Sequence, residues 1–174
     1  MKDRLEMCYV PIFSYKCLNI VDEYTRECLA LEARRGMTAE DIRVILAEVA
    51  AGRGGPPCRM RSDNGPEFVA EVVRSWLEDT GSGTLPVAPG SPWQNGSAES
   101  FHSKVRDEFL NREEFESEPQ ARALGALWKE ESNTERPHSS LGYQTPAEFA
   151  ATCERYVPID EDLPDLSSAE STNR

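Results

Sequence analysis

The sequence predicts one α/β domain in which helices cover a mixed sheet. Two strand-like segments form an early hairpin, helical and strand-like patterns then alternate, and only helical patterns follow residue 97. This order is typical of helices packed on a sheet. We expect a core at residues 1–153 and an acidic, disordered tail at 154–174, because 174 residues give one domain a sizeable core.

The strand-like segments can be read in chain order. Residues 17–22 and 28–33 flank a short polar turn and predict a β-hairpin. Residues 58–62 predict a short strand that carries Asp63, and residues 84–87 an edge strand. Residues 1–7 lack the apolar alternation of a central strand. We therefore expect the first strand of the sheet to be incomplete or atypical.

Five helices are predicted from caps and apolar periodicity. Thr38 and Asp41 form a capping box that opens a helix of about three turns. A second amphipathic helix contains Val72 and Trp76, and a last one begins at the capping box of Thr145. The third begins near Ser97, and the fourth covers residues 120–131.

The faces of the third and fourth helices are expected as follows. One face of the third is apolar (Ala98, Phe101, Val105, Phe109), another is polar (Glu99, His102, Ser103, Arg106), and the fourth packs through Leu124, Leu127 and Trp128.

Composition limits the function classes. The net charge of −12, of which residues 154–174 contribute −4, opposes non-specific nucleic-acid binding, so any DNA contact requires a local basic patch. Five cysteines without a CxxC spacing predict buried free thiols rather than disulfides or a zinc site. No apolar run is long enough to cross a membrane and no secretory signal is present, so we expect a cytoplasmic protein without membrane partners.

Two acidic residues carry the chemistry. Asp63 follows a predicted strand, Glu99 lies on a predicted helix, and 35 residues separate them. Carboxylates from a strand end and a helix can converge on a divalent metal, and such oxygen ligands suit Mg²⁺ held against phosphates. Phosphodiester transfer is the predicted chemistry. His102 and His138 are expected to form hydrogen bonds rather than bind metal, and Trp76 and Trp128 to lie in the core.

Several ordered segments closely resemble the integrase core of bacterial insertion-sequence (DDE-type) transposases, which are relatives of retroviral integrases. They are residues 20–30, 61–68, 89–96, 99–102 and 133–143. The resemblance implies an RNase H-like fold and an aspartate, aspartate, glutamate metal triad for DNA strand transfer. Asp63 matches the second ligand and Glu99 the third, and two Mg²⁺ or Mn²⁺ ions are implied.

The resemblance also implies DNA as partner, both element ends and target, and either a homo-oligomer or association with a full-length transposase. Asn64, Gln94 and Asn95 are then expected to position DNA near the metals, while Lys104 and Arg106 contact phosphates.

The first ligand has two interpretations. On an ungapped correspondence it is Asp3, with 59 residues between it and Asp63. Alternatively, the polar stretch around Asp3 follows a ligand that the chain lacks, which would make this an N-terminally truncated core. The sequence leaves open an active polynucleotidyl transferase, an inactive remnant that keeps the fold, and an RNase H-like nuclease without joining activity.

Overall fold

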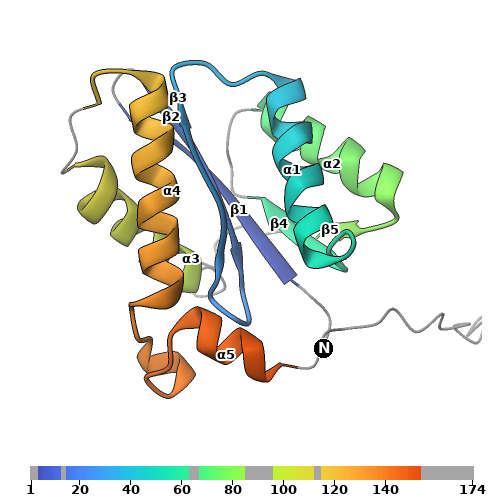
Figure 1. The fold of residues 1–174 in the computed structure, drawn as a ribbon. Coiled ribbons are helices and arrows are strands. Elements are labelled where there is room, and N and C mark those ends of the chain that lie inside the picture. The colour runs from blue at the N-terminus through green and yellow to red at the C-terminus, as the bar shows by residue number, and fades with distance from the viewer. Residues whose placement is uncertain (1–3, 13–14, 63–66, 85–95, 112–114, 154–174) are drawn as a thin grey trace, which may run out of the picture.

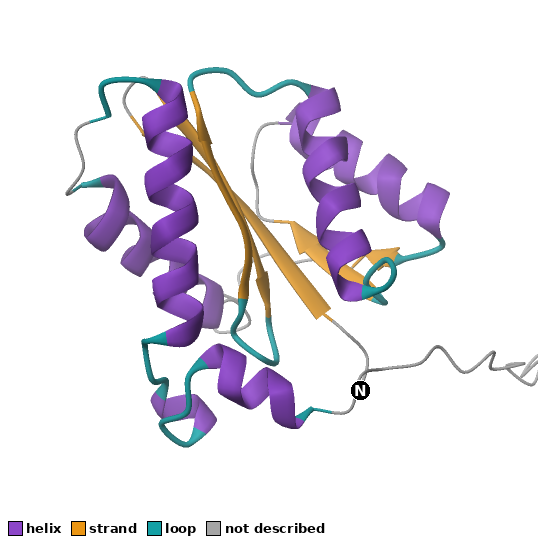
Figure 2. Cartoon of the chain, in the orientation of Figure 1, coloured by secondary structure: helices purple, strands orange, loops and turns teal. Residues whose placement is uncertain are grey.

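The computed structural model describes residues 4–12, 15–62, 67–84, 96–111 and 115–153 (Figures 1 and 2). Its sheet has the strand order β3-β2-β1-β4-β5. The strands are β1 (Arg4–Ile12), β2 (Tyr15–Asp22), β3 (Cys28–Arg34), β4 (Arg59–Ser62) and β5 (Gly83–Thr84). The first three form an antiparallel meander, whereas β4 runs parallel to β1 and β5 parallel to β4. The predicted mixed sheet and its hairpin are confirmed.

The strand β1 lies at the centre of the sheet. Leu5 and Met7 point into the core on one face, while Glu6 and Cys8 lie on the other. The strand is atypical, as the sequence indicates, because it buries a carboxylate: Glu6 is 4% exposed. It is not incomplete in the described part of the chain, since it is nine residues long, eight of which pair with β2 and four with β4. The strand begins only at Arg4, so residues 1–7 contain too little of it for its pattern of side chains to be recognised in the sequence.

Helices cover both faces of this sheet (Figure 1). The first pair, α1 and α2, packs on one face, and α3 continues through a π-helix, η2, on the other beside α4. The elements are α1 (Ala39–Arg53), α2 (Glu67–Thr80), α3 (Gly96–Lys104), η2 (Val105–Leu110), α4 (Glu118–Thr134), the 3₁₀ helix η3 (Ser139–Leu141) and α5 (Pro146–Thr152).

Both predicted capping boxes are present. The Asp41 amide donates to Thr38 Oγ1 over 3.2 Å, and the Thr38 amide donates to Asp41 Oδ2 over 2.8 Å. Thr145 opens α5 with the same pair of bonds to Glu148. The helix α1 runs for 15 residues, about one turn longer than expected, and ends at Gly54, whose φ of 81° suits a residue without Cβ.

The hydrophobic core between the sheet and the helices α3, η2 and α4 confirms most of the expected helix faces. Phe101, Val105 and Phe109 are buried, and Trp128 packs against both phenylalanine rings with centroids 5.8 and 6.5 Å away. An α-helix has 3.6 residues per turn, so side chains spaced four residues apart move gradually around its axis. The wider π-helical turn of η2 offsets this rotation and keeps Phe109 on the same buried face as Phe101 and Val105.

One expected contact of α4 is wrong, because Leu127 is 67% exposed. The helix faces the sheet through Ala121, Gly125 and Trp128 instead. The approach at Gly125 is close, since a Cβ there would lie 3.4 Å from the Leu31 carbonyl oxygen, at van der Waals distance. Trp76 and Trp128 lie in the core, as predicted.

The edge strand β3 is covered by side chains of α4. The Asn133 amide donates to the Cys28 carbonyl over 2.9 Å, and its oxygen accepts from the Cys28 amide over 2.8 Å. Lys129 Nζ donates to the Leu29 carbonyl over 3.4 Å. These bonds satisfy backbone groups that an open edge would leave to water.

All five cysteines are free thiols, and three of them are buried, namely Cys8, Cys17 and Cys28. Burial raises the pKa of the Cys17 thiol to about 12. Cys58 and Cys153 are only partly buried, so the prediction of buried thiols holds for three of the five. None of the described helices has the length and apolar content needed to cross a membrane.

A buried ion pair joins the sheet to α1. Asp22, at the end of β2, is 1% exposed and pairs with Arg53, whose second nitrogen lies 2.8 Å from Glu27 Oε2. Asp22 Oδ1 also accepts the amides of Tyr24 and Thr25 at 2.8 and 3.1 Å. The β2–β3 turn is thereby fixed by one carboxylate.

We expect Arg53→Gln to lower the free energy of unfolding by about 2–3 kcal/mol, because it leaves the Asp22 carboxylate buried without its cation. Arg43→Gln on the same helix is the matched control. Its pair with Asp79 is exposed and 3.8 Å long, so its loss should cost within about 0.5 kcal/mol. Urea unfolding measures both, and equal losses would contradict the role given to Asp22.

Candidate functional site

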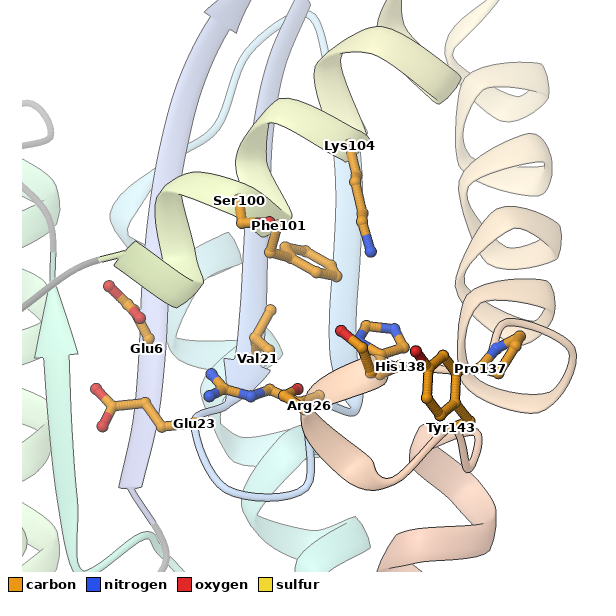
Figure 3. Close-up of a pocket in the computed structure, with 12 residues that line it drawn as sticks. Glu6, Val21, Glu23, Arg26, Ser100, Phe101, Lys104, Pro137, His138 and Tyr143 are labelled. Atoms are coloured by element: carbon orange, nitrogen blue, oxygen red, sulfur yellow. The ribbon is translucent and has the colours of Figure 1, made fainter. Parts of the chain in front are cut away.

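A cavity of about 480 Å³ opens on the α3 face of the sheet (Figure 3). Four parts of the chain line it: β1, the end of β2 with the turn that follows, α3, and the segment 137–143. The lining residues are Glu6, Val21, Glu23, Arg26, Ser100, Phe101, Lys104, Pro137, His138, Ser139, Ser140 and Tyr143. The cavity is therefore assembled from segments far apart in the sequence.

One end of the cavity is acidic. Glu6 of β1 and Glu23 of the turn lie at this end, with their carboxylates away from Lys104 (Figure 3). Arg61 of β4 reaches Glu23 Oε1 at 3.4 Å. Because Glu6 pairs with Arg61 in the β1–β4 ladder, the acidic end lies where β1, β4 and the turn meet.

The rest of the cavity is basic. The ammonium group of Lys104 extends from α3 toward His138, and Arg26 enters from the turn with its guanidinium on the side of Glu23 (Figure 3). Within the part of the chain that the structure describes, neither Arg26 nor Lys104 forms an ion pair. Arg136 borders this end, but Glu131 Oε1 at 2.8 Å and Glu108 neutralise it.

Arg26 has a left-handed backbone, with φ of 64°. Such a conformation costs a non-glycine residue roughly 1–2 kcal/mol. The turn holds it in place, because the Arg26 amide donates to the Asp22 carbonyl over 2.9 Å and Thr25 Oγ1 donates to Glu27 Oε2 over 2.8 Å. The Asp22 network thus fixes the position of the Arg26 side chain.

The opposite wall is a loop closed on itself. The His138 amide donates to the Gln144 carbonyl and the Tyr143 amide to the His138 carbonyl, both over 2.9 Å. Leu141 anchors the loop in the core, being 6% exposed. Tyr143 also has positive φ, 65°, and presents a ring that is 77% exposed at the rim of the cavity.

The pKa of the His138 imidazole reflects the positive charges near it. Partial burial, followed by the charges of Lys104, Arg26 and Arg136, holds the pKa of His138 below its ordinary value of 6.5. The ring is therefore neutral at pH 7 and accepts a hydrogen bond at one of its nitrogens.

The structure brings only part of the predicted site into view. Lys104 lines the cavity, whereas Arg106 is exposed on η2 and is not among the lining residues. Glu99 belongs to α3 and directly precedes Ser100, a lining residue, but its side chain lies outside the described part. The remaining predicted residues, Asp3, Asp63, Asn64, Gln94 and Asn95, lie outside the described residues.

Sequence reasoning missed three lining residues, Glu6, Arg26 and Tyr143. Arg26 and Tyr143 stand in segments 20–30 and 133–143, which carry the family resemblance, so a signal was present without an assigned role. Glu6 gave none. His102 forms the expected hydrogen bond, with Nε2 3.1 Å from Asn19 Oδ1.

The donor chemistry at the acidic end fits a hard cation. Glu6 and Glu23 offer carboxylate oxygens, which are ligands that Mg²⁺ and Mn²⁺ accept. Among the described residues no group of three His, Cys, Asp or Glu side chains can hold a metal ion. A complete site therefore needs ligands from outside that part, and Asp63 directly follows β4 in the sequence.

Comparison with protein families finds two matching models, both described as integrase core domain, at residues 4–92 and 81–146. A 39.2 kDa protein of insertion element IS476 from Xanthomonas euvesicatoria is 41% identical over 136 residues, which are 78% of this chain and 39% of that protein. The transposase of insertion sequence IS904 from Lactococcus lactis is 25% identical over 150 residues, 83% of this chain and 58% of its own length. The chain thus spans well under two thirds of either relative.

Solved structures share the fold. The catalytic core domain of BIV integrase superposes with a TM-score of 0.63 at 18% identity, covering 83% of this chain and 91% of that one. A chain of the simian T-cell lymphotropic virus intasome superposes with a TM-score of 0.65 at 15% identity, covering 92% and 58%. These likenesses confirm the expected RNase H-like mixed sheet flanked by helices.

The depressed pKa of His138 makes stability depend on pH. As pH falls below about 6.5, the unfolded chain takes up a proton that the folded chain resists, so stability is lost until the folded pKa is passed. We expect His138→Gln to lose less stability than wild type between pH 7.5 and 5.5 in urea unfolding.

Lys104→Gln should raise the His138 pKa measured by NMR, because it removes a positive charge near the ring. An unchanged pKa would contradict the proximity of the Lys104 ammonium to the imidazole.

Proposed function

Because this chain belongs to the integrase core domain family, we propose that it is the catalytic core of an insertion-sequence transposase, which cleaves and joins DNA strands with divalent metal ions. One observation carries the proposal. The acidic end of the cavity is bordered by β4, which leads directly to Asp63, and by α3, which contains Glu99. In the sequence, Asp63 follows the first of these elements and Glu99 belongs to the second, which supports both as ligands at this end.

The proposed ligands are Asp63 and Glu99, with two Mg²⁺ or Mn²⁺ ions. When bound, such ions activate water or a DNA 3′-hydroxyl and stabilise the leaving oxygen of an in-line displacement. The integrase core family is generally dependent on divalent metal. The protein's own part is to hold the cations with carboxylates and to orient the DNA, for which Lys104, Arg106, Asn64, Gln94 and Asn95 are the proposed contacts.

The third carboxylate has two candidates. Asp3 directly precedes β1, and Glu6 lies within it, 4% exposed and at the acidic end. The place of Glu6 at the acidic end of the cavity, paired in the ladder with β4, supports it as the ligand, in a position that the motif comparison does not reach.

DNA is the proposed partner, both as element ends and as target. With a net charge of −12, the chain needs bound cations and a local basic surface to approach phosphates. We propose that it works together with further copies or with a longer transposase, since one structure that shares its fold is a chain of an intasome.

A labelled duplex with a free 3′-hydroxyl tests the reaction. In Mn²⁺ we expect joined products that are longer than the substrate, and their loss in Asp63→Asn and in Glu99→Gln. Shortened products alone would instead identify a nuclease, and no product at any protein concentration would identify an inactive remnant. Either result would overturn the proposal.

Metal binding gives a readout that needs no turnover. Mn²⁺ titration followed by water proton relaxation should show weaker binding, by about tenfold or more, in Asp63→Ala and in Glu99→Ala. The same loss in Glu6→Gln but not in Asp3→Asn would identify Glu6 as the third ligand, and the reverse would identify Asp3. If the Asp63→Ala and Glu99→Ala variants bind Mn²⁺ like wild type, the proposed site is wrong.

A further inference from the structure

We propose that the basic end of the cavity, formed by Arg26, Lys104 and His138 with Tyr143 at its rim, binds one backbone phosphate and one base of a DNA strand. This inference rests on the proposed function and deepens it. It assigns a role to the β2–β3 turn and to the segment 137–143, neither of which holds the proposed catalytic carboxylates. It also predicts how a strand lies across the site.

Charge is the first argument. In the described part of the chain, the other arginines that approach carboxylates are paired, as Arg53 is with Asp22 and Arg136 with Glu131. Arg26 and Lys104 come from separate elements, form no ion pair among the described residues, and line one cavity. In a chain with a net charge of −12, these two cations, with Lys104 directed at a neutral imidazole and Arg26 between His138 and Glu23 (Figure 3), form a local site for an anion.

Backbone conformation is the second argument. Among the described residues, the only two non-glycine residues with positive φ are Arg26 and Tyr143, at 64° and 65°, and both line this cavity. Residues held in unfavourable backbone conformations concentrate at binding sites, where the surrounding structure enforces them. Here the Asp22 network enforces one, and the closed 138–144 loop enforces the other.

Side-chain chemistry identifies the ligand. A phosphate accepts hydrogen bonds from a guanidinium, an ammonium and hydroxyls together, and Ser139 and Ser140 line the same cavity. Tyr143 adds a ring that is 77% exposed, and exposed aromatic rings beside a basic groove serve as stacking platforms for bases. Free inorganic phosphate would use the cations but not the ring.

The two ends of the cavity define the path of the proposed DNA strand across the site. The acidic end borders the proposed metal ligands, so the reacting phosphate belongs there. The basic end then receives another phosphate of the same strand, and Tyr143 stacks on a base beside it (Figure 3). Anchoring the strand at this second point would orient the reacting phosphate.

Fluorescence anisotropy with a labelled duplex that has a single-stranded end, in Ca²⁺, tests the site. We expect Arg26→Gln and Lys104→Gln each to weaken binding severalfold and to reduce the slope of log K against log salt by about 0.7–0.9. Tyr143→Ala should weaken binding about fivefold or more with an unchanged slope. Arg74→Gln, an exposed arginine on α2 across the sheet, is the matched control and should bind like wild type.

Arg26→Gly separates binding from folding. Glycine adopts positive φ without strain, so this variant should melt at the same temperature as wild type or higher while binding DNA as weakly as Arg26→Gln. If Arg26→Gly and Lys104→Gln bind DNA like wild type with an unchanged salt slope, the inference fails. Equal weakening by Arg74→Gln would also overturn it, because the effect would then be one of overall charge.

Further arms identify the ligand. DNA binding should raise the His138 pKa measured by NMR, because a phosphate counters the cations around the ring. A rise with inorganic phosphate but not with DNA, or tighter binding of an RNA of the same sequence, would overturn the assignment to DNA.

Failure of this inference and failure of the proposed function are distinguishable. The basic-end variants should keep wild-type Mn²⁺ binding. Strand transfer by wild type, together with undiminished DNA binding by these variants, rejects the inference alone. Absence of any strand transfer, with DNA binding lost in the variants, rejects the proposed function and supports the DNA site.

Discussion

The buried carboxylate of Asp22 organises the parts of this protein that matter for its site. It closes the β2–β3 turn through two backbone amides and joins that turn to α1 through Arg53. The turn also lies beside α5 (Figure 2), and the rings of Tyr24 and Phe149 lie 5.3 Å apart there. A charge with 1% exposure is expensive to bury, and it is stabilised only while all these partners stay in place. Glu23 and Arg26 both follow Asp22 within four residues, so the backbone of both is positioned by this one ion pair.

The charges around the cavity bear on how an acidic chain could act on an anionic substrate. Under the proposed function, the carboxylates would repel phosphate until cations occupied the acidic end, whereas Arg26 and Lys104 would attract it without them. Divalent ions would then control both chemistry and affinity at one end, and salt would control affinity at the other. Because the favourable charges are few and local, geometry would matter more than long-range attraction in the proposed binding of DNA.

Local chemistry made much of the fold predictable. The capping boxes at Thr38 and Thr145 and the hairpin follow from short-range patterns. The exposure of Leu127 did not, because helical periodicity alone does not choose between adjacent faces of a helix. Motif order singled out Asp63 and Glu99, whose side chains lie outside the described part, and the helix of Glu99 suggested Lys104, which lines the cavity. Glu6 escaped notice because a buried carboxylate breaks the alternation that identifies a strand, and residue type does not reveal the positive φ of Arg26.

Asn133 has a consequence beyond capping β3. Its amide group does for Cys28 what a sixth strand would do, at a separation of 105 residues. A second chain therefore cannot extend the sheet at that position without first displacing the end of α4. The same end of α4 leads within five residues to His138 and the cavity wall. Sheet edge and cavity wall thus form one cooperative unit: exchange of the Cys28 amide with solvent would report on whether the wall is closed.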